Sequence, residues 1–283
     1  MEIARTIETV RKLVKSVRSK GKRIGLVPTM GALHIGHISL IERAVEECDF
    51  VVVSIFVNPT QFGPAEDYDK YPRDLDADLK ICKKAGVDVV FAPPVEQMYA
   101  ARNLTWVNVE KLTEPLCGRF RPGHFRGVTT VCAKLFNIVG ADIAYFGQKD
   151  AQQALVIKRM VTDLNMPLEI VVCPTVREPD GLAVSSRNQY LTNRQRKDAA
   201  CIYKSLQKCR QMIDAGVEDA QEIINQMHKV INQVPSIEIE YLSIVNAETL
   251  QPVEHITGTI LVAIAIKIGK VRLIDNILLD FSK

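Results

Sequence analysis

Short runs of β-branched residues alternate with longer helical patterns along the first 175 residues, and this alternation constrains the fold more than any other feature. It is typical of parallel strands joined by crossover helices. The expected strands are 23–27, 50–57, 88–92, 143–146 and 169–173. Apolar residues at three- and four-residue spacing predict helices at 34–48, 72–85, 128–139 and 151–164. The sequence therefore predicts an α/β fold built on a doubly wound parallel sheet.

The pattern changes after Pro179-Asp180-Gly181, a tripeptide typical of turns. Helical periodicity then covers 193–216 and 219–234, and strand-like runs follow at 238–245 and 259–266. We therefore expect a Rossmann-like domain at residues 1–176. Residues 177–283 are expected to form a smaller C-terminal α+β domain that closes over the active site. The first twenty residues mix charged and apolar side chains, which favours an amphipathic helix over a secretory signal.

Bulk properties exclude several classes of protein. The formal net charge of +3 is too small to favour a nucleic-acid partner. The most apolar run, Thr259–Ile266, is far shorter than the roughly twenty residues of a membrane-spanning helix, so no membrane partner is expected. The seven cysteines are scattered and never spaced as in zinc or redox motifs, which favours free thiols in the cytoplasm. No metal site built from protein side chains is predicted.

The first expected strand leads into a helix that opens on His34-Ile35-Gly36-His37. A helix N-terminus offers free N–H groups and the positive end of the helix dipole, so this segment suits a phosphate. Gly36 lacks a Cβ, and the flanking imidazoles could donate to phosphate oxygens. The alternative is a pair of capping or core histidines around a packing glycine. The position between strand and helix favours the phosphate site.

The second expected strand runs into Asn58 and Gln61, which begin a polar connection over 58–73. Connections of this length are often lids or binding loops. The amide of Gln61 can both donate and accept, so it could read the hydroxyls and carboxylate of a small polar substrate. The alternative is a solvated surface loop in which Asn58 and Gln61 are turn residues.

Two further strand ends carry polar residues. Gly147-Gln148-Lys149-Asp150 repeats the arrangement of the first site, with Lys149 as a cation for phosphate and Asp150 as a possible acceptor from ribose hydroxyls. Its alternative is a helix cap beside a solvated lysine. Ser185-Ser186-Arg187 suits a polyphosphate, because arginine can engage two oxygens at once. Helix capping ahead of Thr192 is the alternative there.

Taken together, the chain resembles the pantothenate synthetase (pantoate–β-alanine ligase) family, which shares the HIGH signature with a larger nucleotidyltransferase superfamily. The resemblance covers essentially the whole chain, and its motifs are Pro28–His37, Phe56–Phe62, Phe146–Asp150 and Ser185–Asn188. It implies a reaction in which pantoate and ATP give pantoyl adenylate and pyrophosphate. β-Alanine then displaces AMP to form pantothenate. The resemblance further implies a homodimer. Mg²⁺ is expected as a cofactor because, on the outer phosphates of ATP, it would help to neutralise the developing charge.

The resemblance also implies roles for individual residues. Gln61 and Gln153 would bind pantoate, Gln61 would also reach β-alanine, and His37 would donate a proton. His34, His37, Lys149 and Arg187 are the expected catalytic residues, because they would neutralise charge on the phosphates. The residues expected to contact ATP are Met30, Gly31, Ala32, Leu33, His34, Ile35, Gly36, His37, Gly147, Gln148, Lys149, Asp150, Val176, Val184, Ser185, Ser186 and Arg187.

Two departures from the family pattern are visible. Val184 stands where the family commonly has methionine, which puts a side-chain contact there in doubt. The lysine-rich KMSKS loop of tRNA synthetases is absent, so its phosphate role would fall to Lys149, Ser185, Ser186 and Arg187.

The chemistry is consistent with this interpretation. A carboxylate with a pKa near 4 is ionised at neutral pH and needs no base to attack phosphorus. In the second step either a histidine or the departing phosphate could accept the amine proton. One alternative is a HIGH-motif nucleotidylyltransferase acting on a phosphate ester, which would call for additional cations near Gln61. Another is a non-catalytic ATP-binding or tRNA-binding module, and the nearly neutral charge disfavours tRNA.

Overall fold

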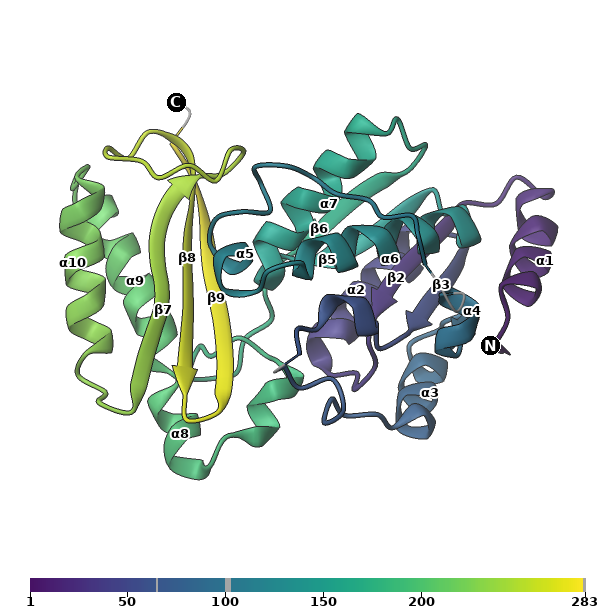
Figure 1. Cartoon of the computed structure of the whole chain (residues 1–283), viewed down its shortest axis with the longest axis horizontal. Coiled ribbons are helices and arrows are strands. Elements are labelled where there is room, and N and C mark those ends of the chain that lie inside the picture. Colours follow the sequence, from purple (N-terminus) through teal and green to yellow (C-terminus); the bar gives the residue numbers. More distant parts are fainter. Residues whose placement is uncertain (65, 100–102, 282–283) are drawn as a thin grey trace. The chain divides into compact units, whose positions relative to one another are not determined.

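The structure is a computed structural model that describes residues 1–64, 66–99 and 103–281 (Figure 1). Ala65, within the predicted 58–73 loop, and residues 282–283 of the predicted second domain lie outside the described residues. Contacts between Cα atoms divide the chain into two compact units. The first comprises Met1–Thr113, Arg121–Gln148 and Gln152–Pro174, and the second comprises Glu114–Phe120, Lys149–Ala151 and Thr175–Lys283.

The first unit contains a six-stranded sheet in the order β1-β4-β3-β2-β5-β6, and every pair of neighbours is parallel. The strands are β1 (Glu2–Ala4), β2 (Ile24–Thr29), β3 (Phe50–Ile55), β4 (Val89–Phe91), β5 (Ile143–Gly147) and β6 (Glu169–Cys173). From β2 the chain moves outward through β3 to β4 and then returns to β5 on the other side. The carboxyl ends of β2 and β5 therefore flank the crevice at which doubly wound sheets bind ligands.

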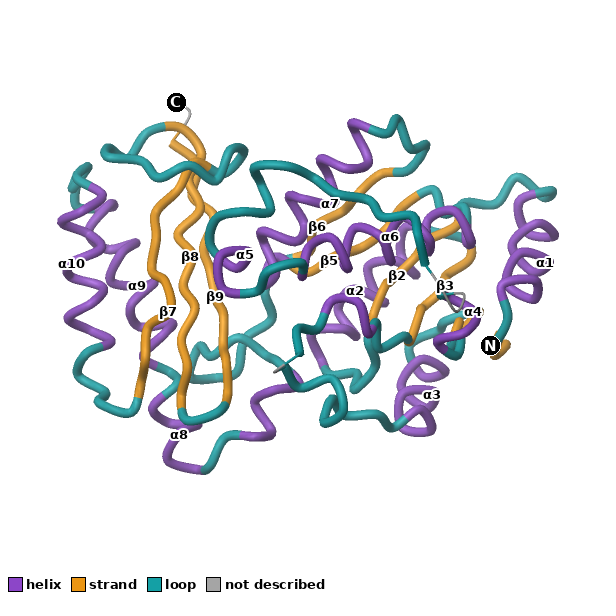
Figure 2. The backbone as a smooth tube through the Cα atoms, viewed as in Figure 1, coloured by secondary structure: helices purple, strands orange, loops and turns teal. Residues whose placement is uncertain are grey.

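Helices cover both faces of this sheet (Figure 2). Leu40 of α2 and Cys82 of α3 belong to one core cluster with Tyr145 of β5. Phe146, the next residue of β5, faces the other way and packs edge-on against Phe136 of α6. The α-helices of this part of the chain are α1 (Ile7–Arg18), α2 (Ile35–Glu47), α3 (Leu75–Lys84), α4 (Val95–Met98), α6 (His124–Val139) and α7 (Ala151–Asp163).

The second unit contains an antiparallel sheet of β7 (Ile237–Asn246), β8 (Gly258–Ile268) and β9 (Val271–Phe281). Leu206 and Ile223 pack with Ile260 of β8 and Leu273 of β9 in one core cluster. The α-helices are α5 (Cys117–Phe120), α8 (Asn193–Asp198), α9 (Cys201–Asp214) and α10 (Ala220–Ile231). The predicted doubly wound parallel sheet and the smaller α+β part are thereby confirmed.

Several predicted elements were wrong in detail. The first twenty residues are not one helix, because residues 2–4 pair with β4 and Thr6 caps a helix that begins at Ile7. The predicted helix 193–216 is two helices, since the N–H groups of Ala200 and Ile202 bond three residues back at the break. Helix α6 begins four residues before the predicted Val128, directly after Gly123 turns the chain with φ +80°.

Strand β9 was not predicted, because its run Ile277-Leu278-Leu279 interrupts the apolar alternation that signals a strand. It pairs along its whole length with β8. Among the described helices, none is both long and apolar enough to cross a membrane.

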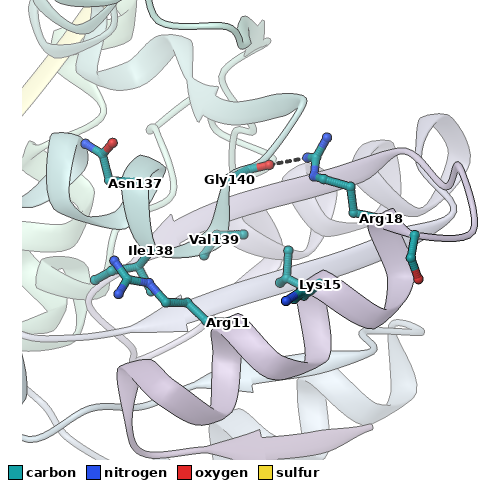
Figure 3. A pocket seen from close by; sticks show the side chains of 9 residues that line it. Arg11, Lys15, Arg18, Asn137, Ile138, Val139 and Gly140 are labelled. Carbon is teal, nitrogen blue, oxygen red and sulfur yellow. Dashed lines mark hydrogen bonds between the residues drawn. The ribbon is translucent and has the colours of Figure 1, made fainter.

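A cavity of about 420 Å³ lies between α1 and the last turn of α6 (Figure 3). Arg11, Lys15 and Arg18 line it, and Arg18 donates to the carbonyl oxygen of Gly140 and pairs with Asp142. Cations at a helix C-terminus stabilise its exposed carbonyls, which accounts for this cluster. Both helices end just before a strand begins, so the cavity lies at the amino ends of the strands, opposite the predicted site.

Candidate functional site

The turn between β2 and α2 is held by a buried carboxylate. Asp78 of α3 is 2% exposed and accepts the N–H groups of Ala32 at 3.0 Å and Leu33 at 2.7 Å. Burial raises the pKa of Asp78, although these two backbone donors act to lower it. Sequence reasoning missed Asp78, since it reads as one of several acidic residues that favour a helix N-terminus.

Gly31 is required within this turn for two reasons. Its φ is +82°, a conformation that costs energy for residues with a Cβ. A Cβ at Gly31 would also lie 2.8 Å from Oδ2 of Asp78. The following residue, Ala32, has φ +51°. The turn is therefore shaped by its backbone conformation and its fit around Asp78, and α2 starts directly after it.

His34 and His37 stack at the N-terminus of α2, with ring centroids 4.0 Å apart and planes 29° apart. Nδ1 of His37 accepts the backbone N–H of His34 at 3.3 Å. A neutral imidazole that accepts through Nδ1 carries its proton on Nε2, so Nε2 of His37 is a donor. Both residues are half-buried. His37 thus has a capping role, as the alternative proposed, but the pair does not lie in the core.

Gly36 lets the His34 ring lie against the start of the helix. A Cβ at Gly36 would lie 3.0 Å from Cε1 of His34. A side chain there would require the ring to shift by a few tenths of an ångström, so the glycine lets the stacked pair pack closely against the helix. This packing reason adds to the predicted one, the close approach of a ligand.

Gln61 is buried in the 3-10 turn η1 (Pro59–Gln61), with 8% of its surface exposed. Its Oε1 accepts from Nδ2 of Asn58 at 3.0 Å, and its Nε2 lies 3.1 Å from Sδ of Met30. Oδ1 of Asn58 accepts from the hydroxyls of Thr60 and Tyr99, both at 2.9 Å, which fixes the Asn58 amide. Asn58 and Gln61 are thus turn residues, as the alternative held, but they are buried and not solvated. The structure also brings Gln61 to Met30.

Helix α6 packs closely against this turn at Gly127. A Cβ at Gly127 would lie 2.4 Å from the carbonyl oxygen of Thr60 and 2.7 Å from Cα of Gln61. The carbonyl oxygen of Gly127 also accepts from Nδ2 of Asn58 at 3.1 Å. Since the opposing atoms are backbone, they cannot swing aside as a flexible side chain could. Sequence reasoning missed Gly127, which lies just before the predicted helix 128–139 and belongs to none of the predicted motifs.

A pocket of about 280 Å³ opens where β2, β3 and β4 end. Met30 and Gly31 line it with Phe56 and Asp78. It shows that the carboxyl edge of the sheet is hollowed beside the first predicted segment.

At the end of β5, Gly147 has open space around it, since a Cβ there would meet no atom within 4 Å. Packing thus does not require this glycine. On α7, Gln152 is buried and donates to the carbonyl oxygen of Leu112 at 2.9 Å, whereas Gln153 is half-buried. The neighbouring amides therefore have different surroundings, and Gln153 is the more accessible.

The remaining predicted residues belong to the second unit. Nζ of Lys149 lies 3.6 Å from a carboxylate oxygen of Asp150, and the carbonyl oxygen of Lys149 accepts from Nδ2 of Asn276 at 2.9 Å. The lysine side chain is 22% exposed, so it is not the solvated charge of the alternative.

Val176 and Val184 are brought together, because the carbonyl oxygen of Val176 accepts the N–H of Val184 at 3.0 Å. The side chain of Val184 is buried. Ser185 caps the turn that follows, accepting the N–H of Arg187 at 3.3 Å. Ser185 thus caps the 3-10 helix Ser186–Tyr190 ahead of Thr192, as the alternative held, whereas α8 is capped by Thr192 with Gln195.

Arg177 anchors this hairpin, although the sequence pattern marked it only as the domain boundary. Its guanidinium donates to both carboxylate oxygens of Asp275, at 2.6 and 3.0 Å, and lies over the ring of Tyr203. Asp275 is 2% exposed. No sequence pattern links residues almost a hundred positions apart, so this pair was out of reach of sequence reasoning.

Known proteins resemble the chain over its full length. The family model described as pantoate-beta-alanine ligase matches residues 2–278. Pantothenate synthetase from Moorella thermoacetica is 56% identical over 282 residues, covering 100% of both chains. The crystal structure of pantothenate synthetase from Thermus thermophilus has a TM-score of 0.94 at 46% identity, covering 98% of this chain and 99% of that one.

A pantoate-beta-alanine ligase from Francisella tularensis, complexed with beta-gamma ATP and beta-alanine, has a TM-score of 0.80 at 39% identity. The alignment covers 98% of this chain and 97% of that one.

Proposed function

This chain belongs to the pantoate–β-alanine ligase family, and we propose that it forms pantothenate through a pantoyl adenylate, with ATP as co-substrate. It is an enzyme that ligates pantoate and β-alanine. The observation that carries the proposal is the stacked His34–His37 pair at the N-terminus of α2, after a turn fixed by Asp78. A helix N-terminus with donor side chains suits the phosphates of ATP.

In the proposed first step, a carboxylate oxygen of pantoate bonds to the α-phosphorus of ATP while the bond to pyrophosphate breaks. Both reactants are anionic, so the protein must neutralise charge and hold them in line. Nε2 of His37 can donate to the phosphates because its Nδ1 is occupied. Lys149 and Arg187 of the second unit are assigned to the same task. Gln61 and Gln153 are assigned to pantoate, and Gln61 also to β-alanine.

The other assignments to ATP keep the predicted set. Within Gly31 to His37, the N–H groups of Ala32 and Leu33 bond Asp78 and that of His34 bonds His37, so the backbone donors assigned to phosphate are those of Ile35 and Gly36. The open space at Gly147 leaves room for a ligand. We assign the residues between Gly147 and Asp150, the hairpin of Val176 with Val184, and Ser185 with Ser186 to the nucleotide as well.

Mg²⁺ is proposed to bind through the outer phosphates of ATP, where it would neutralise part of their charge. In the described part of the chain, no three His, Cys, Asp or Glu side chains group together as a metal site. The chain itself is proposed to act as a homodimer in the cytoplasm, where its seven free thiols would remain reduced.

The proposed intermediate predicts that ATP and pantoate together release pyrophosphate without β-alanine. A coupled pyrophosphate assay would measure this release, with pantoate omitted as the control. Addition of β-alanine is expected to convert the accumulated adenylate to pantothenate. Pantothenate formation without any release before β-alanine is added would contradict the adenylate mechanism while leaving the ligase activity intact.

Replacing Asp78 with asparagine is expected to raise the KM for ATP by about tenfold, because only one amide oxygen remains to accept two backbone N–H groups. Steady-state kinetics with varied ATP would measure it. Asp76→Asn, on an exposed position of the same helix, is the matched control and should leave KM unchanged. Equal KM values in the two variants would show that the turn does not depend on Asp78.

A further inference from the structure

Two side chains form hydrogen bonds with the backbone carbonyl oxygen of Gln61. Nδ1 of His124 lies 2.8 Å from this oxygen, and Nη2 of Arg121 donates to it at 3.2 Å. Nη1 of Arg121 lies 3.2 Å from Nε2 of His124. Arginine can only donate, so Nε2 of His124 must accept, and the proton of the neutral imidazole resides on Nδ1. His124 therefore donates to Gln61, and Arg121 sets the tautomer that makes this possible.

Glu66 holds Arg121 in place. Nε of Arg121 donates to Oε1 of Glu66 at 2.8 Å, and Nη2 donates to Oε2. The arginine and glutamate side chains are 13% and 25% exposed. Burial acts to raise the pKa of Glu66, but the hydrogen bonds and charge of Arg121 outweigh it and keep the pKa below its ordinary value. The pair is therefore fully ionised at neutral pH, and its bidentate geometry fixes the guanidinium plane.

All three nitrogens of Arg121 are thus engaged with protein groups: Nε with Glu66, Nη1 with His124, and Nη2 with Glu66 and Gln61. Four of its five N–H donors are thereby directed at protein groups. Two of the contacts lead to Gln61, whose side-chain amide is assigned to pantoate: Nη2 bonds its carbonyl oxygen directly, and Nη1 contacts His124, which bonds the same oxygen. These contacts are those of a residue that positions Gln61.

Gln61 is fixed from three directions. Asn58 orients its side-chain amide, Gly127 lets α6 lie against its Cα, and the Arg121–His124 pair holds its carbonyl. Glu66 lies five residues further along the 58–73 connection. Its ion pair with Arg121 therefore links that loop to the segment just before α6.

We propose that Arg121, His124 and Glu66 are positioning residues that hold Gln61 in the geometry needed to bind pantoate. This inference rests on the proposed function, because it assigns the effect to the substrate read by Gln61. The proposal predicts different effects on the two substrates of the first step. ATP is assigned to the turn after β2, whereas the Arg121–Glu66 pair contacts the turn after β3.

The test compares Arg121→Lys and Glu66→Gln with the wild type. Lysine keeps the charge but cannot bond Glu66, His124 and Gln61 together, and glutamine keeps the shape of Glu66 but loses its charge. Both variants are expected to raise the KM for pantoate by about tenfold or more and to change the KM for ATP less than about twofold. Pyrophosphate release at varied pantoate and varied ATP gives both constants.

Arg272→Lys is the matched control. Arg272 donates to Glu240 at 2.6 Å in another half-buried ion pair, in the sheet of the second unit. The Arg272→Lys variant should have a lower midpoint of thermal unfolding, and its KM values for pantoate and ATP should not change. His124→Asn supplies a rescue, because its amide can replace the Nδ1–H donor, whereas His124→Ala cannot. We expect the asparagine variant to bind pantoate more tightly than the alanine variant.

Calorimetric titration of pantoate separates this inference from the proposed function. Weaker pantoate binding in Arg121→Lys, with an unchanged KM for ATP, supports the positioning role. Equal increases in both KM values, or a change in unfolding temperature alone, would overturn it. Failure of the wild type to form pantothenate would instead contradict the proposed function, whatever the variants bind.

Discussion

His37→Ala is expected to lower turnover by about 100-fold or more, because a side chain that donates to the reacting group commonly supplies this much. The expected loss in the free energy of unfolding is much smaller, about 1 kcal/mol, which corresponds to a lost helix-capping interaction. Nδ1 of His37 accepts the N–H of His34, so the substitution removes a structural contact as well as the donor. Turnover and chemical denaturation should be measured on the same preparation.

His37→Gln separates the two roles. Glutamine at the third helical position can accept the N–H of the capping residue, so it should restore most of the lost stability. It cannot replace the imidazole as a proton donor, and turnover should stay low. If glutamine restored turnover in parallel with stability, the histidine would be a capping residue and its assignment to catalysis would be wrong.

Gly127→Ala is the second substitution with a large expected effect. An alanine usually stabilises a helix interior by about 1 kcal/mol relative to glycine. Here the added Cβ would lie 2.4 Å from the carbonyl oxygen of Thr60, so helix and turn must separate. Overpacking of this kind costs about 1–3 kcal/mol and should outweigh the helix propensity. Displacement of Gln61 by about 1 Å is expected to lower kcat/KM for pantoate about 100-fold.

Kinetics with varied pantoate and a thermal unfolding curve would measure both effects. Asn137→Ala, at an exposed position of the same helix, is the control and should leave both quantities nearly unchanged. If Gly127→Ala kept the kcat/KM and the stability of the wild type, α6 would not set the position of the turn.

The parts of the site that could be predicted lie at strand ends in local motifs. His34 and His37 could be recognised because a helix N-terminus after a strand is a local pattern, and their side chains do meet. Five of the six strands of the doubly wound sheet followed from periodicity, whereas β1 lay in a segment predicted to be helical. The separation of Gln152 from Gln153 could not be predicted, because both fall in the first turn of one helix and differ only in tertiary surroundings.

The supporting residues were out of reach for a related reason. Asp78 acts on a turn more than forty positions earlier, and Arg121 acts on Gln61 sixty positions earlier. Each contact depends on how helices lie on the sheet, which no local pattern specifies. Gly127 is informative only once its neighbour across the interface is known, since its role is to leave room for the backbone of Thr60.

The interleaved composition of the two units has a consequence for how the chain folds during synthesis. Residues 114–120 and 149–151 belong to the second unit, although they are translated long before residues 175–283. Phe120 packs on Tyr241 with ring centroids 5.9 Å apart, and the carbonyl oxygen of Lys149 accepts from Asn276. Phe120 cannot meet its partner until β7 has been translated, and Lys149 cannot meet Asn276 until β9 has been translated. A polypeptide truncated before β9 would therefore lack Asn276, the donor to the Lys149 carbonyl oxygen, although it would keep Tyr241, the partner of Phe120.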